Sequence, residues 1–103
     1  PGSIEILIGA LKEKDGHVRS KAARALGGIG PGAREAIPVL LDALRDQEAH
    51  VRWDAARALG QIGAAAAEGL AAAVHDRDPV VRQIAADALK RIIQRKREIH
   101  SAD

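Results

Sequence analysis

Three arginine residues each follow a valine at regular intervals along the chain. They are Arg19, Arg52 and Arg82, separated by 33 and 30 residues. Because a guanidinium group can pair with a carboxylate or a phosphate through two hydrogen bonds, one role for them is a row of cations that binds an anionic ligand. The alternative is a structural ladder, in which they bind acidic side chains and helix-terminal carbonyls within the chain. Four acidic residues are available for such pairing: Asp42, Asp46, Asp76 and Asp78.

The sequence contains a single aromatic residue, Trp53. The residues that directly follow the other two arginines are Ser20 and Gln83, and these polar counterparts predict a surface position for Trp53. Tryptophan and arginine are enriched at binding hot spots. We therefore predict a protein-binding patch. Its centre is formed by Trp53, Arg57 and Ile84, and its rim by Arg24, Gln61 and Asp87. The alternative is that Trp53 covers a gap between repeated units.

Basic residues are concentrated near the C-terminal end of the chain. Residues 90–98 contain one acidic residue, Glu98, and five basic residues: Lys90, Arg91, Arg95, Lys96 and Arg97. The net charge is +2, and the rest of the chain holds 11 basic and 13 acidic residues. Anion binding is therefore a candidate for this segment alone, and a solvated helix end is the alternative. The remainder gives no reason to expect nucleic-acid binding.

The composition excludes several kinds of chemistry. The chain has no Cys, Met, Phe or Tyr, which excludes disulfides, thiolate metal sites and a cysteine nucleophile. His17 and His50 are equivalent in the repeat and are expected on the order of 10 Å apart, too far to share a metal ion. No nucleophile with an adjacent base can be assigned. We predict a non-enzymatic protein without cofactor or metal. The lack of an apolar run of about 18 residues predicts no membrane span, and the lack of Cys fits the cytoplasm.

These residues lie in an internal repeat. Residues 4–30 and 37–63 are identical at 15 of 27 aligned positions, and 67–93 follow the same pattern. Each unit predicts two helices, the first over roughly 3–14, 35–46 and 64–75 and the second over roughly 16–29, 49–62 and 79–98. Asp15 and Asp78 suit N-cap positions, and Gly30 and Gly63 suit helix ends. The third unit lacks such a glycine, which predicts that its second helix continues as a terminal cap.

The pattern D-x-x-V-R-x-x-A-A-x-A-L-G-x-I-G, which begins at Asp15 and recurs in part from Glu48 and Asp78, resembles the HEAT-like repeats of the phycobilisome-lyase type. The resemblance implies an all-α fold, a right-handed α-solenoid of three helix pairs with six helices. It also implies that the second helices line a concave surface, and it favours the structural ladder for Arg19, Arg52 and Arg82. Packing residues agree between the units while the residues between them differ, as expected of a recognition surface.

We therefore expect one repeat domain over 4–98, with a tag remnant at 1–3 and a tail at 99–103. Its predicted function is a non-enzymatic scaffold that binds a protein or peptide on the concave face. One alternative is a fragment or subunit of a bilin-lyase-like protein. Related hydroxylases use repeated His-Glu pairs, which this chain lacks, and related DNA glycosylases need several aromatic residues. The other alternative is weak binding of nucleic acid or an anionic surface by the basic C-terminal segment.

The first predicted helix carries more apolar residues than one outer face needs. These residues are Ile4, Ile6, Leu7, Ile8 and Leu11. A neighbouring repeat or a second copy of the chain could cover them. The sequence therefore also predicts possible self-association through this helix.

Overall fold

The computed structural model describes residues 2–101, with side chains through Glu98. The chain forms helices joined by turns and two short 3₁₀ segments. In order along the chain the elements are α1 (Gly2–Ala10), α2 (Gly16–Ile29), η1 (Gly30–Ala36), α3 (Ile37–Ala43), α4 (Ala49–Ile62), η2 (Ala64–Ala66), α5 (Ala67–Ala73) and α6 (Pro79–Ser101). Within the described part of the chain the fold is therefore all-α.

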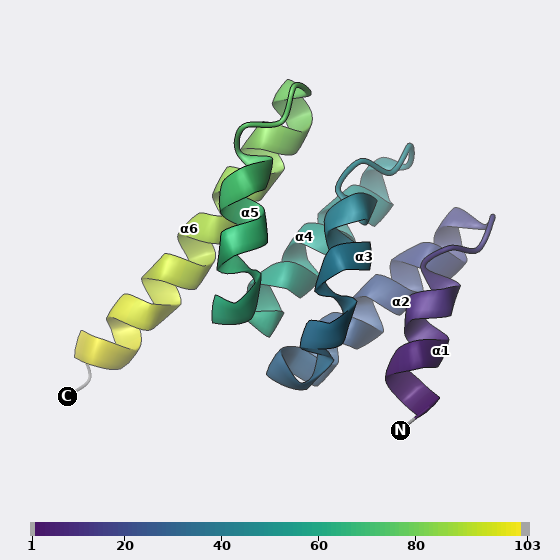
Figure 1. Cartoon of the computed structure of the whole chain (residues 1–103), viewed down its shortest axis with the longest axis horizontal. Coiled ribbons are helices and arrows are strands. Elements are labelled where there is room, and N and C mark those ends of the chain that lie inside the picture. The colour runs from purple at the N-terminus through teal and green to yellow at the C-terminus, as the bar shows by residue number, and fades with distance from the viewer. Residues whose placement is uncertain (1, 102–103) are drawn as a thin grey trace.

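The helices pack as successive antiparallel pairs, α1 with α2, α3 with α4 and α5 with α6. In Figure 1 the pairs stand side by side from the N-terminal to the C-terminal end, with α1, α3 and α5 in one layer and α2, α4 and α6 in the other. The molecule is thin, with extents of 44 × 35 × 18 Å. One helix pair cannot bury both of its faces, so each pair depends on its neighbour for a core.

The second helix of each pair starts where the sequence predicts, and α2 and α4 also end at the predicted residues. The carboxylate of Asp15 accepts a hydrogen bond from the His17 amide at 2.8 Å, and that of Asp78 accepts one from the Val80 amide at 2.9 Å. Gly30 and Gly63 end α2 and α4 with φ angles of 75° and 89°. A side chain is strained at such angles, which explains why glycine stands at both positions.

The first helices are shorter than predicted. The segments before α3 and α5 form the 3₁₀ turns η1 and η2, and α1, α3 and α5 end in turns before the positions where the pattern placed their ends. Pro31 and Pro38 lie at the starts of η1 and α3, where a missing N–H is tolerated. The helices of this layer are consequently only seven to nine residues long.

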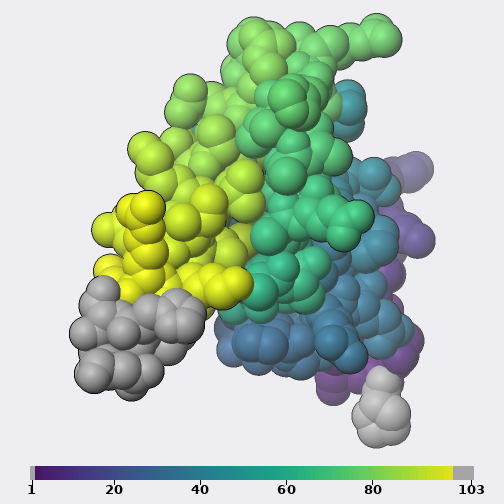
Figure 2. All heavy atoms as spheres, turned by 60° about the vertical axis from the view of Figure 1, so that its left-hand side comes forward, coloured from purple at the N-terminus to yellow at the C-terminus, as the bar shows by residue number. Residues whose placement is uncertain are grey.

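The last helix continues as predicted, with 23 residues in α6. It extends through Ser101, into the segment that we expected to be a tail. Pro1 of the predicted tag remnant and residues 102–103 of that tail lie outside the described residues. In the space-filling view α6 forms one edge of the molecule (Figure 2).

The core lies between the two layers and between successive pairs. It consists of leucine, isoleucine and valine side chains with many alanines, which let the helix backbones approach closely. Its largest fully buried side chains include Leu26, Leu40, Leu59 and Leu70. None of the helices in the described part is long and apolar enough to cross a bilayer.

Candidate functional site

Arg19 joins the first two pairs. Its Nε and Nη2 donate to the two carboxylate oxygens of Asp46 at 2.7 and 3.0 Å, and its Nη1 donates to the backbone carbonyls of Glu13 and Lys14, both at 2.8 Å. Arg19 is only 8% exposed. This guanidinium therefore binds the loop between α1 and α2 and also the Asp46 carboxylate of the next repeat, which is the pairing between repeats that the structural ladder requires.

The other two arginines keep only the contacts within their own repeat. Arg52 donates through Nη1 to the Asp46 carbonyl at 2.6 Å, and Arg82 donates to the carbonyls of Asp76 and Arg77. By repeat equivalence Asp76 would pair with Arg52, but its carboxylate instead pairs with Arg45. The Nε of Arg52 is consequently buried without a hydrogen-bond partner among the described atoms. The predicted pairing between repeats therefore occurs at Arg19 but not at Arg52.

The Arg19–Asp46 pair shifts the protonation of both groups. Burial favours the neutral form of Asp46, but hydrogen bonds from Arg19 and from the Glu48 amide, at 2.9 Å, outweigh it and lower the pKa of this carboxyl. The hydrogen bond to Asp46 in turn raises the pKa of Arg19 against the cost of desolvation. Both groups are therefore charged at neutral pH.

The face formed by α2, α4 and α6, here called the second-helix face, carries most of the predicted patch. Trp53 is 53% exposed, while its counterpart Ser20 is buried beneath the next repeat. Ser20 and Arg24 both donate to the carboxylate of Asp54. Arg57 is exposed and Gln61 is half-buried. The surface position predicted for Trp53 is thus observed, and its role in binding stays a prediction.

Ile84 is wrongly assigned to this patch. Its side chain is 2% exposed and belongs to the core. Its counterpart Asp54 shows why, because that position faces the preceding repeat, where Ser20 and Arg24 bind it. The equivalent Lys21 is exposed because the described chain has no repeat before the first. Asp87, one turn further along α6, is half-buried and accepts a hydrogen bond from Gln83 at 3.1 Å.

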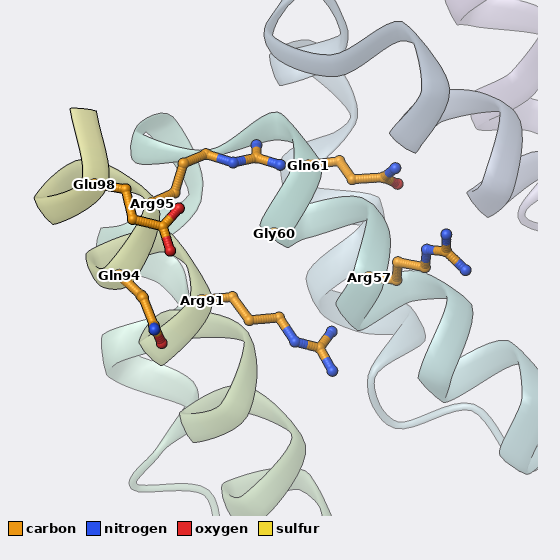
Figure 3. Close-up of a pocket in the computed structure, with 7 residues that line it drawn as sticks. All are labelled: Arg57, Gly60, Gln61, Arg91, Gln94, Arg95 and Glu98. Atoms are coloured by element: carbon orange, nitrogen blue, oxygen red, sulfur yellow. The ribbon is translucent and has the colours of Figure 1, made fainter. Parts of the chain in front are cut away.

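A groove opens on the second-helix face between the C-terminal halves of α4 and α6 (Figure 3). Its volume is about 410 Å³. We call it the arginine groove, and it is lined by Arg57, Gly60, Gln61, Arg91, Gln94, Arg95 and Glu98. In Figure 3 the side chains of Arg91 and Arg95 reach from α6 toward α4. The structure thus brings together residues that the sequence assigned to two separate sites.

A smaller hollow of about 170 Å³ continues the arginine groove toward α2. Arg57 and Gln61 line both spaces, and Arg24 and Asp54 complete the smaller one. The remaining basic residues of the C-terminal segment do not line either space. Lys90 and Arg97 line an adjoining depression on α6, which shares Gln94 and Glu98 with the arginine groove, and Lys96 is exposed. Only Arg91 and Arg95 of the five predicted anion-binding residues therefore face the groove.

The paired histidines are closer than predicted. The ring centroids of His17 and His50 are 5.5 Å apart and the rings are stacked, because these side chains lean together between α2 and α4. Across the described residues, no three His, Cys, Asp or Glu side chains converge as a metal site would require. The His pair is therefore a packing contact between repeats.

The outer helix α1 leaves apolar surface open. Ile6 is 72% exposed, and Ile4, Leu7 and Ile8 are half-buried against the core. No residue of α1 is fully buried. The surface from which we predicted self-association is therefore accessible in the single chain.

The comparisons with known proteins agree with this architecture. A family model described as HEAT repeats matches residues 4–90, and the chain belongs to the HEAT-repeat family. Among solved structures, one engineered protein from the Northeast Structural Genomics Consortium is similar with a TM-score of 0.63 and 30% identity over 90% of this chain. A second engineered protein from the same consortium has a TM-score of 0.51 and 27% identity over 88% of this chain.

The chain spans about half the length of these two engineered proteins, 46% and 51% respectively. A search among curated proteins found no match. The family and its helix packing are therefore established for this chain.

Proposed function

We propose that the chain is a non-enzymatic scaffold module that binds a protein or peptide on its second-helix face. The observation that supports this is the coincidence of the half-exposed Trp53 with the 410 Å³ arginine groove on one side of the molecule. Trp53, Arg57 and Gln61 are spaced four residues apart on α4, so they share one side of that helix. An aromatic anchor beside a polar groove is typical of a protein-binding hot spot.

The finer features of the family resemblance support the same role. We infer that the three pairs are repeats of the phycobilisome-lyase type, in a right-handed superhelix that ends with the extended α6. In that arrangement the second-helix face is the concave one, and its residues are free to differ between repeats. The residues shared between repeats are the arginines of the ladder, the helix-capping residues and the alanines of the core, and all of these have structural roles. The residues that differ between repeats are therefore the ones we expect to bind a partner.

A pull-down comparison tests this function. The wild-type chain and the double variant Trp53→Ala, Arg57→Ala are immobilised and exposed to the same protein mixture, with Lys12→Ala, Lys14→Ala as a control on exposed residues away from this face. We expect specific proteins to be retained by the wild type and the control and lost from the double variant. Equal retention by all three would show that the second-helix face is not the binding surface.

We further propose that the chain self-associates end to end. Glu13 on the outer side of the first repeat is the sequence counterpart of Asp46, and Arg82 of the last repeat is the counterpart of Arg19. Both are exposed. A second copy stacked against the first repeat would therefore reproduce the Arg19–Asp46 pair and cover Ile6. Such a head-to-tail contact leaves an unpaired surface at each end of the assembly and therefore favours oligomers of variable length.

Light scattering against concentration tests this association. We expect the apparent mass of the wild type to rise with concentration, and the charge reversal Glu13→Arg to suppress that rise. Combining Glu13→Arg with Arg82→Glu restores the opposite charges, so it should restore association. A monomer at all concentrations, or a rise that is unchanged in Glu13→Arg, would refute end-to-end stacking.

A further inference from the structure

The arginine groove opens where α6 packs less closely on α4 than α4 does on α2. Gly27 of α2 lies so close to α4 that an added Cβ would stand 2.9 Å from the Cα of Ala58. The equivalent glycine of the next repeat is Gly60, and a Cβ added there would meet nothing within 4 Å. The contact that closes the space between α2 and α4 is thus missing between α4 and α6, and Figure 1 shows α6 continuing past the end of α4.

The arginines of this groove are not neutralised by the chain. Arg19, Arg24 and Arg45 each form an ion pair, with Asp46, Asp54 and Asp76. Arg57, Arg91 and Arg95 form none with the side chains that the structure describes, and Glu98 is the one carboxylate among the lining residues. Arg91 and Arg95 reach into the groove from α6, while Arg57 borders it from α4 and extends toward the smaller hollow (Figure 3). These guanidinium groups create a local positive field that favours an anionic ligand.

The spacing of these arginines suits an acidic peptide. Arg91 and Arg95 are one turn apart on α6, about 6 Å along the helix axis. Side chains on one face of an extended peptide recur every ~6.6 Å, so carboxylates at alternate positions can meet both guanidinium groups. Gln94, which lines the groove from α6, offers an amide donor and acceptor to the peptide backbone. Trp53, on the same side of α4 as Arg57, can pack against an apolar residue of the peptide.

We propose that the arginine groove binds a carboxylate-rich peptide segment, whose Asp or Glu side chains pair with Arg57, Arg91 and Arg95. This inference rests on the proposed binding function of the second-helix face and names its ligand class. A peptide fits better than a nucleic acid, because Glu98 lies in the groove and the chain outside 90–98 has more acidic than basic residues. A phosphate backbone longer than the groove would meet those negative charges.

Selection from a random library of displayed 12-residue peptides against the whole chain tests the ligand class. We expect at least a twofold enrichment of Asp and Glu in the selected peptides. Affinity of the selected peptides is then measured with the double variant Arg91→Ala, Arg95→Ala. The expected loss is at least tenfold, since two charge-assisted hydrogen-bonded contacts are removed.

The matched control is Lys90→Ala, Arg97→Ala, which removes two positive charges from the same helix but outside the groove. Equal losses with both double variants would overturn the proposal, because the effect would then depend on net charge alone. Tighter binding of a 20-nucleotide single-stranded DNA than of the selected peptides, lost only with the groove variant, would assign the groove to nucleic acid instead. Recovery of no acidic peptide would also overturn it.

The selection also separates this inference from the proposed function. Peptides without acidic enrichment whose binding is lost in Trp53→Ala would refute the ligand class while supporting the second-helix face as the binding surface. Acidic peptides that bind to Trp53→Ala and to Arg91→Ala, Arg95→Ala as tightly as to the wild type would refute both the ligand class and the second-helix face as the binding surface. All of these variants change exposed side chains, and their thermal unfolding is measured alongside to establish that they fold.

Discussion

Gly27 of α2 lies directly against Ala58 of α4, at a separation that leaves no room for a side chain. We predict that Gly27→Ala destabilises the fold by roughly 1–3 kcal/mol, because the added methyl group forces the two helices apart. Denaturant unfolding measures this change. The control is the neighbouring Gly28→Ala, where a Cβ meets nothing within 4 Å. It should stabilise α2 by up to about 1 kcal/mol, and a similar loss in both variants would contradict the crowding argument.

The positive φ angles at the helix ends give a second prediction. Gly63 has a φ of 89°, and a Cβ added there would meet nothing within 4 Å. Gly63→Ala should nevertheless cost roughly 1–3 kcal/mol, since the strain comes from the backbone conformation itself. Gly60→Ala, within the same helix and also uncrowded, is the control and should not destabilise the protein. Circular dichroism during thermal unfolding follows both variants.

The Arg19–Asp46 pair makes stability depend on pH. The folded state lowers the pKa of Asp46 below its ordinary value, so this group stabilises the fold when the pH is above the pKa of the unfolded chain, about 3.9. The stabilisation is lost as the pH falls from there through the folded pKa. We expect Asp46→Asn to lower the melting temperature by several degrees at pH 7 and to flatten its decline below pH 4. Parallel curves for the two proteins would exclude the pair as a source of acid sensitivity.

The single tryptophan provides a direct reading of the binding face. Because Trp53 is 53% exposed and the chain has no Tyr or Phe, its fluorescence reports this face alone. We predict that acrylamide quenches Trp53 readily in the free chain and less after a peptide selected for the arginine groove has bound. The emission maximum should shift to shorter wavelength in the same titration. Quenching that is unaffected by a saturating peptide would place the ligand elsewhere.

Local sequence rules account for the caps and the repeat. The carboxylates of Asp15 and Asp78 and the glycines at 30 and 63 act within one turn of the chain, so their roles follow from residue type and spacing. The continuation of α6 follows in the same way from the missing glycine at its expected end. The first helices were predicted too long because apolar periodicity does not distinguish their terminal turns, or the 3₁₀ turns η1 and η2, from α-helix.

The placement of surface residues depended on the neighbouring repeat and was less predictable. Lys21, Asp54 and Ile84 are equivalent in the repeat, yet Lys21 is exposed, Asp54 is half-buried and Ile84 is buried. This position faces the preceding repeat, and the described chain has no repeat before the first. Arg45 forms an ion pair with Asp76, the residue equivalent to Asp46, and Arg52 therefore lacks the carboxylate partner that the ladder predicts. The groove itself was missed because it arises from the looser packing of α6 on α4, which the repeat pattern does not predict. Its arginines were nevertheless identified as candidates from their residue type.

The two walls of the arginine groove differ in how firmly they are held. Arg57 and Gln61 project from α4, whose flanking residues Ala58, Leu59 and Ile62 are buried in the core. Every residue from 93 to 98 of α6 is exposed, so Arg95 and Glu98 stand on a stretch of helix that the core does not anchor. A small tilt of this stretch can widen or narrow the opening with little loss of buried contacts. The same framework can thereby accommodate peptides of different bulk, at the entropic cost of immobilising the end of α6 each time one binds.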